Sequence, residues 1–339
     1  MRTYRFGAGT LAQLGEVCAE VGITRPLLVT TGRGARVATD LPVVGMYDGV
    51  QPHVPIETVN EVVALVGELN ADGLVALGGG SSIDTAKAVA GELAGAGQAP
   101  PAIVAVPTTY AGAEYTPFYG ILLGPGRKGG GSNEAALPIA AIYDPELTLE
   151  LPLAETVGTA MNALAHCAEA YYHPAATRRA MRHADTGATA IGYSLPIVVR
   201  DPKGLYGRSR LLEGAMRAAE ALGASGLCLA HAMAQAVGGR YGVPQGAANA
   251  VCLPVAVRFN AEAVPEAVAR FAKALGVDDA PARCAELAEL GGFGRLRDLG
   301  VPEDDLEGLA AATAERAGTK ANPRPAAAAQ IAELFSSVW

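Results

Sequence analysis

The sequence predicts an α/β domain built on a parallel sheet, followed by an all-helical domain. Two patterns support this prediction. Short apolar runs alternate with helical periodicity in the first 150 residues, and strand-like runs nearly stop after Pro152. A chain of 339 residues is also long for a single domain. We therefore assign residues 1–154 to the α/β domain and 155–339 to the helical domain.

The first domain contains four apolar runs with the length and composition of buried strands, at 26–31, 41–47, 73–77 and 102–107. Residues 56–69 place valine and leucine at helical spacing, and a further helix is expected from about Ser82. Alternation of strands and helices is typical of a parallel sheet covered on both faces. A Gly-rich loop or hairpin is expected at 120–137, followed by a short strand with the sequence IAAIYD.

The second domain is rich in Ala and Leu at helical spacing from Leu153 onward. Five segments that contain Pro or Gly interrupt this pattern: HPAAT, RDPKG, YGVPQG, VDDAP and ANPRP. Such segments end helices. The sequence therefore predicts a bundle of helices joined at these five points.

Composition excludes several classes of protein. The net charge is −8, and no basic stripe is present, so we expect no nucleic-acid partner. The five cysteines are scattered and form no C-x-x-C pair, which is typical of reduced thiols in a cytosolic protein. No apolar stretch is long enough to cross a bilayer, and the N-terminus lacks a signal core. We expect a soluble cytoplasmic protein without a membrane partner.

The stretch LVALGGGSSIDTAKAVA places three glycines between a predicted strand and a predicted helix. Glycine lets the backbone approach a ligand closely, and the N–H groups at a helix start favour a phosphate. Ser81 and Ser82 are placed to cap the helix or to donate to that phosphate. A tight turn without a ligand is the alternative, but three consecutive glycines exceed what a turn requires. The pattern is not G-x-G-x-x-G.

A second loop, VPTTYAGAEYTP, follows the strand predicted at 102–107. It gathers the hydroxyl groups of Thr108, Thr109, Tyr110 and Thr116 just beyond the end of that strand. Open α/β sheets bind ligands at the carboxyl ends of their strands. A Thr-rich turn would explain this loop in isolation, but a neighbouring phosphate loop makes a ligand site the better interpretation.

Four motifs in order, GGGSSIDTAKA, PTTYAGAEYTP, IYDPELTLELP and MNALAHCAEAYY, resemble the iron-containing alcohol dehydrogenase superfamily. Tyr110, the Gly-Arg-Lys at 126–128 and Asn162 resemble its maleylacetate reductase branch. The resemblance extends from about residue 4 to 270. It implies an N-terminal dinucleotide-binding domain with a Rossmann-like parallel sheet, a helical C-terminal domain and an active site in the cleft between them. It also implies a homodimer.

The resemblance implies a nicotinamide cofactor. It assigns the pyrophosphate to the glycine turn, and it places an acid and a lysine near the nicotinamide. The implied cofactor contacts are Gly78, Gly79, Gly80, Ser81, Asp84, Lys87, Thr108, Thr109 and Thr116. An ordinary helical ion pair is the alternative for the acid and the lysine.

The choice between NADH and NADPH depends on the residues after the first predicted strand. The superfamily often has an Asp where this chain has Thr31, and such an acid would repel a 2′-phosphate. Arg33 and Arg36 are cations close to that position. We therefore hypothesise that the enzyme accepts NADPH, together with NADH.

Metal-dependent members of the superfamily bind a divalent ion through one Asp and three His. The corresponding residues here are Asn162, His166, His231 and Gln245, and Gln235 occupies a position where a catalytic His is common. Amide oxygens are poor ligands for Fe²⁺ and Zn²⁺. Glu169 shares the helix face of His166, but a structural pairing is the commoner role for such a residue. We expect no tightly bound metal.

Other groups must then polarise the substrate. We assign proton donation to His166 and His231, since imidazole titrates near neutrality, with the Tyr110 hydroxyl as a further donor. Arg127 and Lys128 are candidate clamps for a carboxylate. The alternatives are buried structural histidines and a solvated basic loop.

Three functions remain open at this stage. The first is an NAD(P)H-dependent, metal-independent reductase of maleylacetate or a similar small unsaturated keto acid, giving 3-oxoadipate in aromatic-compound catabolism. The second is a reductase of a carbonyl, enone or imine in a biosynthetic pathway, which the replacements Gln235 and Gln245 favour. The third is a nucleotide-binding homologue without redox activity.

Overall fold

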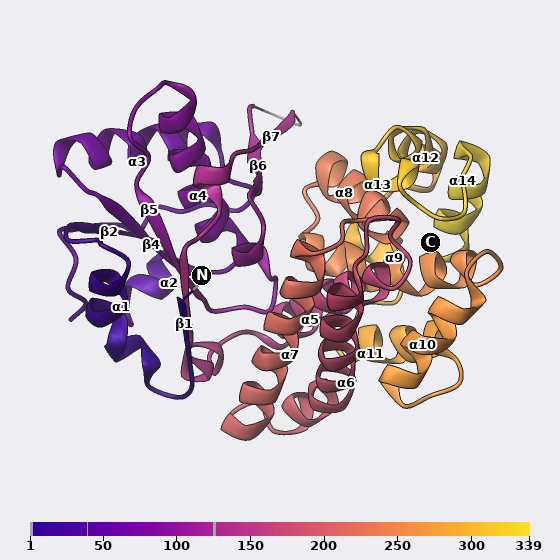
Figure 1. Ribbon diagram of the computed structural model, residues 1–339. Coiled ribbons are helices and arrows are strands. Elements are labelled where there is room, and N and C mark those ends of the chain that lie inside the picture. Colours follow the sequence, from indigo (N-terminus) through magenta and orange to yellow (C-terminus); the bar gives the residue numbers. More distant parts are fainter. Residues whose placement is uncertain (1–2, 39, 125–126) are drawn as a thin grey trace. The chain divides into compact units, whose positions relative to one another are not determined.

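The computed structural model describes residues 3–38, 40–124 and 127–339. The chain divides into two compact units, the first ending at Thr148 and the second beginning at Leu149 (Figure 1). The sequence places this boundary after Ala154. The difference arises because the first long helix of the second unit already begins at Leu153, directly after its N-cap residue Pro152.

The first unit is built on a six-stranded sheet in which every pairing is parallel, with strand order β1-β8-β5-β4-β2-β3. A separate antiparallel pair joins β6 to β7. The strands are β1 (Thr3–Phe6), β2 (Pro26–Thr30), β3 (Gly45–Tyr47), β4 (Gly73–Gly78), β5 (Ala102–Pro107), β6 (Phe118–Leu122), β7 (Lys128–Ser132) and β8 (Ala140–Tyr143). The helices are η1 (Thr10–Gln13), α1 (Leu14–Glu20), α2 (Gly32–Ala35), α3 (Ile56–Glu68), α4 (Gly80–Gly95), η2 (Ala113–Tyr115), η3 (Glu134–Ala136) and η4 (Pro145–Thr148).

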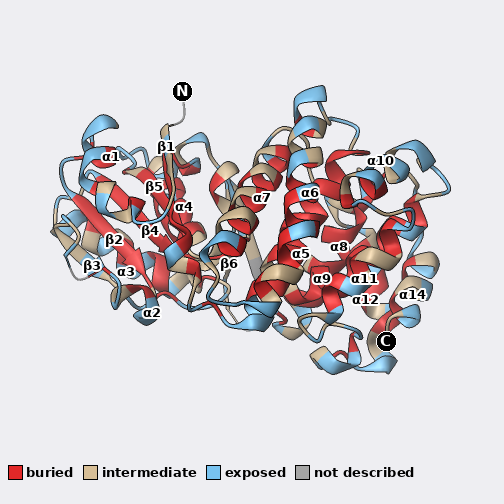
Figure 2. Ribbon diagram, turned by 90° about the horizontal axis from the view of Figure 1, so that it is seen from below, coloured by how far each residue is buried: buried red, intermediate tan, exposed pale blue. Residues whose placement is uncertain are grey.

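The core of this unit lies on both faces of the sheet, because side chains of a strand alternate between the two faces. Along β4, Leu74 and Ala76 pack with α3 and α4, whereas Val75 and Leu77 pack with α1 on the opposite face. Every residue of β4 is buried, as Figure 2 shows for the centre of the sheet. A strand buried on both faces has an uninterrupted apolar sequence, which is why its position was predictable.

The connections of two adjacent strands run in opposite directions. From β2 the chain goes outward to the edge strand β3, whereas from β4 it passes through α4 to β5 on the other side. A crevice forms at the carboxyl ends of two such strands, and open α/β sheets bind their ligands there. The glycine turn follows β4 directly, so it lies at this switch point.

The structure confirms most of the predicted elements in this unit and shifts a few. The run at 41–47 forms a strand only at Gly45–Tyr47, and the helix expected from Ser82 begins at Gly80. Gly79 has the extended backbone of an N-cap residue, so the third glycine already belongs to the helix. The Gly-rich segment forms the β6–β7 hairpin, and the strand β1 was not predicted.

The second unit is entirely helical in its described secondary structure. The helices are α5 (Leu153–Ala170), α6 (Arg178–Arg200), α7 (Leu205–Gly223), α8 (Leu229–Tyr241), α9 (Gln245–Asn260), α10 (Pro265–Leu275), α11 (Ala280–Glu289), η5 (Arg297–Leu299), η6 (Glu303–Asp305), α12 (Leu306–Ala314), α13 (Ala317–Lys320) and α14 (Ala328–Ser337). The five predicted helix-breaking segments all lie at breaks between helices.

The helix α5 lies at the centre of this unit and packs against α6, α7, α9 and α11. Its residues from Ala160 to Ala170 are all buried (Figure 2). Polar side chains on this stretch are therefore removed from water and must find partners inside the protein. Among the described residues, none of the helices combines the length and apolar character needed to cross a membrane.

Candidate active site

The glycine turn has a backbone that other residues would not tolerate. Gly78 has a φ of 153°, and a Cβ atom there would lie 2.3 Å from the Ser82 Oγ. A Cβ on Gly79 would lie 2.9 Å from the Thr109 Cγ2. No side chain caps the first turn of α4. The Ser82 and Ile83 N–H groups donate to the Gly79 carbonyl, whereas the N–H groups of Gly80 and Ser81 have no partner among the described residues and remain available for an anion at the positive end of the helix dipole.

A polar side chain close to this turn also lacks a partner. The Ser82 Oγ is buried and has no hydrogen-bond partner among the described residues, while Ser81 is half-buried. Burying an unsatisfied hydroxyl is unfavourable. The bare backbone and this hydroxyl together fit a phosphate, as the glycine pattern predicts, and the family resemblance implies that this phosphate belongs to a dinucleotide diphosphate.

The end of β2 forms the other side of the switch point. The Thr30 hydroxyl donates to the Leu77 carbonyl over 2.7 Å and ties β2 to β4. The Thr31 Oγ1 accepts from the Gly34 N–H at 3.4 Å as the N-cap of α2, so its immediate role is local. Arg33 is exposed on α2. Thr31 and Arg33 as cofactor contacts stay predictions.

The pair Asp84–Lys87 anchors a loop to α4. Lys87 is completely buried, and its ammonium donates to the Thr116 hydroxyl at 3.1 Å, to the Phe118 carbonyl at 3.2 Å and to the Ala113 carbonyl. Its Nζ lies 3.5 Å from the Asp84 carboxylate. Burial raises the pKa of Asp84, and the charge of Lys87 opposes that rise. The lysine and Thr116 thus hold the segment that leads from η2 into β6.

The remaining residues predicted in the first unit differ in exposure. Tyr110 is completely buried, Thr109 is buried and Thr108 is half-buried. Arg127 is exposed, and its carbonyl accepts from the Leu123 N–H in the hairpin turn. The side chain of Lys128 lies outside the described part of the structure.

The second unit contains a buried pair of imidazoles. His166 on α5 and His231 on α8 stack with 4.6 Å between ring centroids and an interplanar angle of 6°. Both side chains are buried, at 4% and 0% exposure. His166 Nδ1 and His231 Nε2 have no hydrogen-bond partner among the described residues. The sequence predicted both histidines, and the structure places them in contact.

Glu169 orients one of these rings. Its Oε2 lies 2.7 Å from His231 Nδ1, and its Oε1 accepts from the His231 backbone N–H at 3.1 Å. Both side chains are fully buried. A carboxylate only accepts hydrogen bonds, so Nδ1 carries the proton toward Glu169, and Nε2 is the nitrogen left for another contact. The sequence predicted a structural partner for Glu169, and the structure shows that this partner is His231, a candidate proton donor.

Two amides complete the cluster. Asn162 Nδ2 lies 3.4 Å from His166 Nε2, and because an amide nitrogen only donates, Nε2 accepts. Neutral His166 then carries its proton on Nδ1. Asn249 on α9 donates to Asn162 Oδ1 at 2.7 Å. Sequence reasoning missed Asn249, although it lies one turn after Gln245, the position at which α9 would supply a metal ligand.

The donor set does not fit a divalent metal. Gln245 is exposed at the first residue of α9, whereas Asn162 is buried and already bonded to another amide. Among the described residues, no three His, Cys, Asp or Glu side chains gather in an arrangement suited to a metal ion. Glu169 is already paired with His231, and two imidazoles with amides at the other two positions leave fewer than the three or four His, Cys or carboxylate ligands that Zn²⁺ or Fe²⁺ usually takes.

Burial and the neighbouring charge determine the protonation of the pair. The pKa of His166 lies well below its usual value, mainly because burial disfavours the imidazolium and also because a charge on His231 would repel it. His166 is therefore neutral near physiological pH. The two rings have different roles available, since the carboxylate of Glu169 contacts His231.

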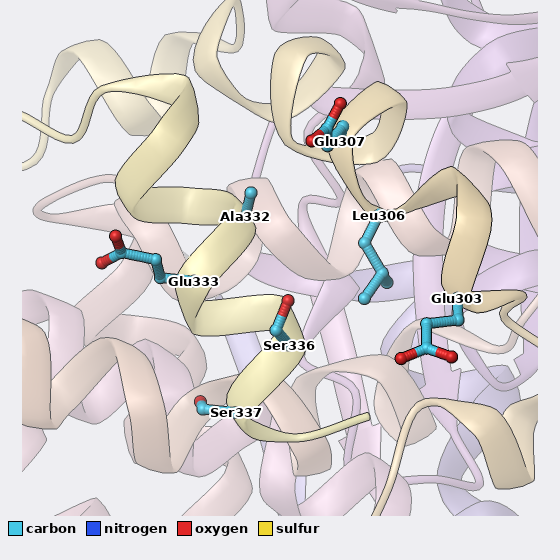
Figure 3. Close-up of a pocket in the computed structure, with 7 residues that line it drawn as sticks. All are labelled: Glu303, Leu306, Glu307, Ala332, Glu333, Ser336 and Ser337. Carbon is cyan, nitrogen blue, oxygen red and sulfur yellow. The ribbon is translucent and has the colours of Figure 1, made fainter.

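The pocket drawn in Figure 3 is separate from this cluster. It has a volume of about 600 Å³ and lies between α14 and the segment formed by η6 and α12. Its lining consists of Glu303, Leu306, Glu307, Ala332, Glu333, Ser336 and Ser337. The lining has no cationic or imidazole side chain, so we assign it no catalytic role.

Comparison with protein families places both units in one lineage. Residues 2–145 match the family model described as iron-containing alcohol dehydrogenase, and residues 156–339 match the C-terminal model of the Fe-containing alcohol dehydrogenase family. The chain belongs to the iron-containing alcohol dehydrogenase family. It is therefore an oxidoreductase.

Its similar relatives point to one branch of that family. The chain is 39% identical to a maleylacetate reductase of Pseudomonas knackmussii, covering 89% of this chain and 86% of that protein. It is 36% identical to a maleylacetate reductase of Sphingobium indicum, with 98% and 93% coverage. The crystal structure of maleylacetate reductase from Agrobacterium tumefaciens superposes with a TM-score of 0.90 at 31% identity, covering 100% of this chain and 96% of that chain. The chain is thus a maleylacetate reductase-like member of the family.

Proposed function

We propose that the protein is an NAD(P)H-dependent, metal-independent reductase of maleylacetate or a similar small unsaturated keto acid. The reaction consumes the keto acid, NAD(P)H and one proton, and gives the saturated keto acid and NAD(P)⁺. The observation that carries the proposal is the stacked imidazole pair, with an unpartnered nitrogen on each ring and amides at the positions of metal ligands. The maleylacetate reductases among its relatives support the substrate class.

The glycine turn is the proposed site for the diphosphate of the cofactor. The backbone N–H groups at the start of α4 bind it, and Gly78 and Gly79 keep the approach free of side chains. NAD(P)H, when bound, supplies the hydride. The residue at position 31 is a threonine and Arg33 is exposed, so no acid there repels a 2′-phosphate, and we infer that NADPH is accepted as well as NADH.

The helical unit supplies the proton. Glu169 holds the Nδ1–H of His231, so a second proton on that ring occupies Nε2 and leaves from there. His166, neutral and stacked on the ring, limits its rotation and keeps it oriented. A metal ion would otherwise stabilise negative charge on the substrate oxygen, and here hydrogen-bond donation replaces it.

A reductase of another carbonyl, enone or imine is the second candidate. The observation that favours it is the replacement of two histidines by Gln235 and Gln245, since neither amide can transfer a proton at neutral pH. This candidate retains the cofactor site and the imidazole pair and changes only the substrate.

The test measures oxidation of NADPH and NADH with maleylacetate, with and without a chelator. We expect turnover with maleylacetate, no loss of activity on chelation, and well below one Fe or Zn per chain by elemental analysis. Activity only with another acceptor would support the second candidate. Cofactor binding without turnover on a broad carbonyl panel would contradict both reductases.

Substitution of a ring tests the role of the pair. His231→Ala should lower kcat by about 10²–10⁴, the usual contribution of general acid catalysis, and leave cofactor affinity within about twofold. His166→Ala should likewise lower turnover more than cofactor affinity. His53, a half-buried residue of the first unit outside the imidazole cluster, provides a control, because His53→Ala is expected to retain full activity. Wild-type turnover in His231→Ala would contradict proton donation by this ring.

A further inference from the structure

Arg316 is a half-buried cation without a charged partner. It is the N-cap residue of α13, and its Nη1 donates to the Gln235 Oε1 at 3.4 Å. Its Nε is buried without a hydrogen-bond partner, and no carboxylate among the described residues forms an ion pair with it. Burial lowers the pKa of Arg316, but a guanidinium keeps its charge at neutral pH.

Arg283 shows how unusual this environment is within the same unit. Its Nε is also buried and unpartnered, yet its Nη1 pairs with Glu286 at 3.0 Å and its Nη2 donates to the Gly192 carbonyl. Removing a cation from water is unfavourable unless a partner compensates. Arg283 has such a partner in the protein, whereas the side-chain partner that the described residues give Arg316 is a neutral amide. The position of Arg316 thus indicates an anion that comes from outside the chain.

Gln235 connects this cation to the imidazole pair. It lies four residues after His231 on α8, so the two side chains occupy the same face of the helix, one turn apart. Because the Gln235 oxygen accepts from Arg316, the guanidinium lies on the same side of α8 as the ring of His231. A carboxylate bound there would lie on the same helix face as the proton donor.

We propose that Arg316 binds a carboxylate of the substrate and that Gln235 positions it. This inference rests on the proposed function and names the group that recognises an anionic keto acid. A guanidinium binds a carboxylate through parallel N–H groups, which fixes orientation as well as charge. Gln235 suits this role because its oxygen accepts from the cation, whereas a protonated histidine at position 235 would repel it.

The experiment uses Arg316→Met, which keeps much of the side-chain volume, and Arg283→Met as the matched control. We expect the KM for maleylacetate to rise at least about tenfold in Arg316→Met, as for loss of one charge-assisted hydrogen bond, with the KM for NADPH unchanged. Arg283→Met should leave both KM values unchanged. An unchanged KM for the keto acid in a folded Arg316→Met would overturn the proposal.

A binding measurement separates this proposal from the reaction itself. Adipate, a saturated dicarboxylate, is titrated into the full chain by calorimetry in the presence of NADP⁺. Wild-type protein should bind adipate, and Arg316→Met should bind it at least about tenfold more weakly. If adipate binds in this way but maleylacetate is not reduced, the substrate assignment fails and the carboxylate site remains. If both proteins bind adipate equally, the site is wrong.

Gln235→Glu provides a second variant that does not remove a buried charge. The new carboxylate would pair with Arg316 inside the protein and compete with adipate, so affinity should fall about as much as in Arg316→Met. Addition of ethylguanidinium to Arg316→Ala should restore part of the lost turnover. Wild-type adipate affinity in Gln235→Glu would contradict the proposal.

Discussion

The glycine turn at the start of α4 and the imidazole cluster of the helical unit present different chemical groups to a ligand. The turn offers backbone N–H groups and depends on the absence of side chains, because a Cβ on Gly78 would collide with Ser82. The cluster depends on side chains, and two of its contacts join distant parts of the sequence: Glu169 with His231, and Asn162 with Asn249. Each site also contains a buried atom that has no hydrogen-bond partner within the described part of the chain: the Ser82 Oγ in the turn and the His231 Nε2 in the cluster.

The comparison teaches that amino-acid substitutions affect the two sites differently. A backbone site retains its ligand as long as the glycines remain, whatever happens to neighbouring side chains. A side-chain site changes its chemistry with each substitution, and here amides already occupy the positions of metal ligands. Each of the following predictions tests this contrast, beginning with the largest expected effect.

A methyl-bearing residue at the glycine turn should separate ligand binding from folding. Gly80 has an ordinary backbone, and its added Cβ would meet only the Ala111 Cβ at 3.9 Å. Gly80→Val should therefore leave the melting temperature almost unchanged. The new side chain would keep the diphosphate away from the backbone N–H groups, so NADPH binding should weaken by about a hundredfold, as for loss of one or two charge-assisted hydrogen bonds. Fluorescence titration with NADPH measures the effect.

Two substitutions of glycine serve as controls for that variant. Gly78→Ala should also lower stability, by about 1–3 kcal/mol, because its φ of 153° strains any other residue. Gly67→Ala in α3, where no atom lies within 4 Å of the new Cβ, should leave binding intact and stabilise the fold by about 0.4–1 kcal/mol. Tight cofactor binding by Gly80→Val would show that the ligand does not approach this turn.

Removal of the negative charge of Glu169 should test whether this carboxylate positions the ring of His231. Glu169→Gln keeps the volume but cannot accept from both the ring and the backbone N–H of His231. We expect kcat to fall about tenfold or more and cofactor affinity to stay unchanged, since the ring loses its fixed tautomer. Glu286→Gln, at an exposed ion pair, is the control. An equal loss of cofactor affinity in Glu169→Gln would indicate a general structural defect instead.

The smallest effect concerns stability against pH. The pKa of His166 is depressed in the folded state, so below about pH 6.5 the unfolded chain binds a proton that the folded chain does not. The free energy of unfolding should therefore fall as the pH drops below about 6.5, by at most about 1.4 kcal/mol per pH unit from this residue. Denaturant unfolding of wild type and His166→Gln between pH 5 and 7 measures the difference. Parallel curves for the two proteins would contradict a neutral buried ring.

Local patterns explain what could be predicted from the sequence. The buried strands and the glycine turn lie in contiguous segments, because a βα unit carries its own apolar run and its own turn chemistry. The histidines were found because they occupy positions in recognisable helical motifs. The mutual contact of the two rings was not visible in the sequence, since nothing in either motif states how α5 packs against α8.

The parts that escaped prediction depend on long-range packing. Asn249 meets Asn162 across 87 residues of sequence, and Arg316 meets Gln235 across 81. No periodicity or spacing connects such pairs. Conversely, Arg127 and Lys128 were candidates because a Gly-rich loop and two cations are conspicuous in a sequence, whereas a single arginine near the C-terminus is not.

The stacking of the two imidazoles limits how much acid the site can store. Burial and the stacking of the rings, whose centroids are 4.6 Å apart, disfavour a positive charge on both, so the pair accepts at most one proton beyond the two that the neutral rings already hold. One proton is also what a single reduction consumes. In the proposed reduction each cycle uses this one extra proton, and the pair must take another from solvent before the next cycle begins.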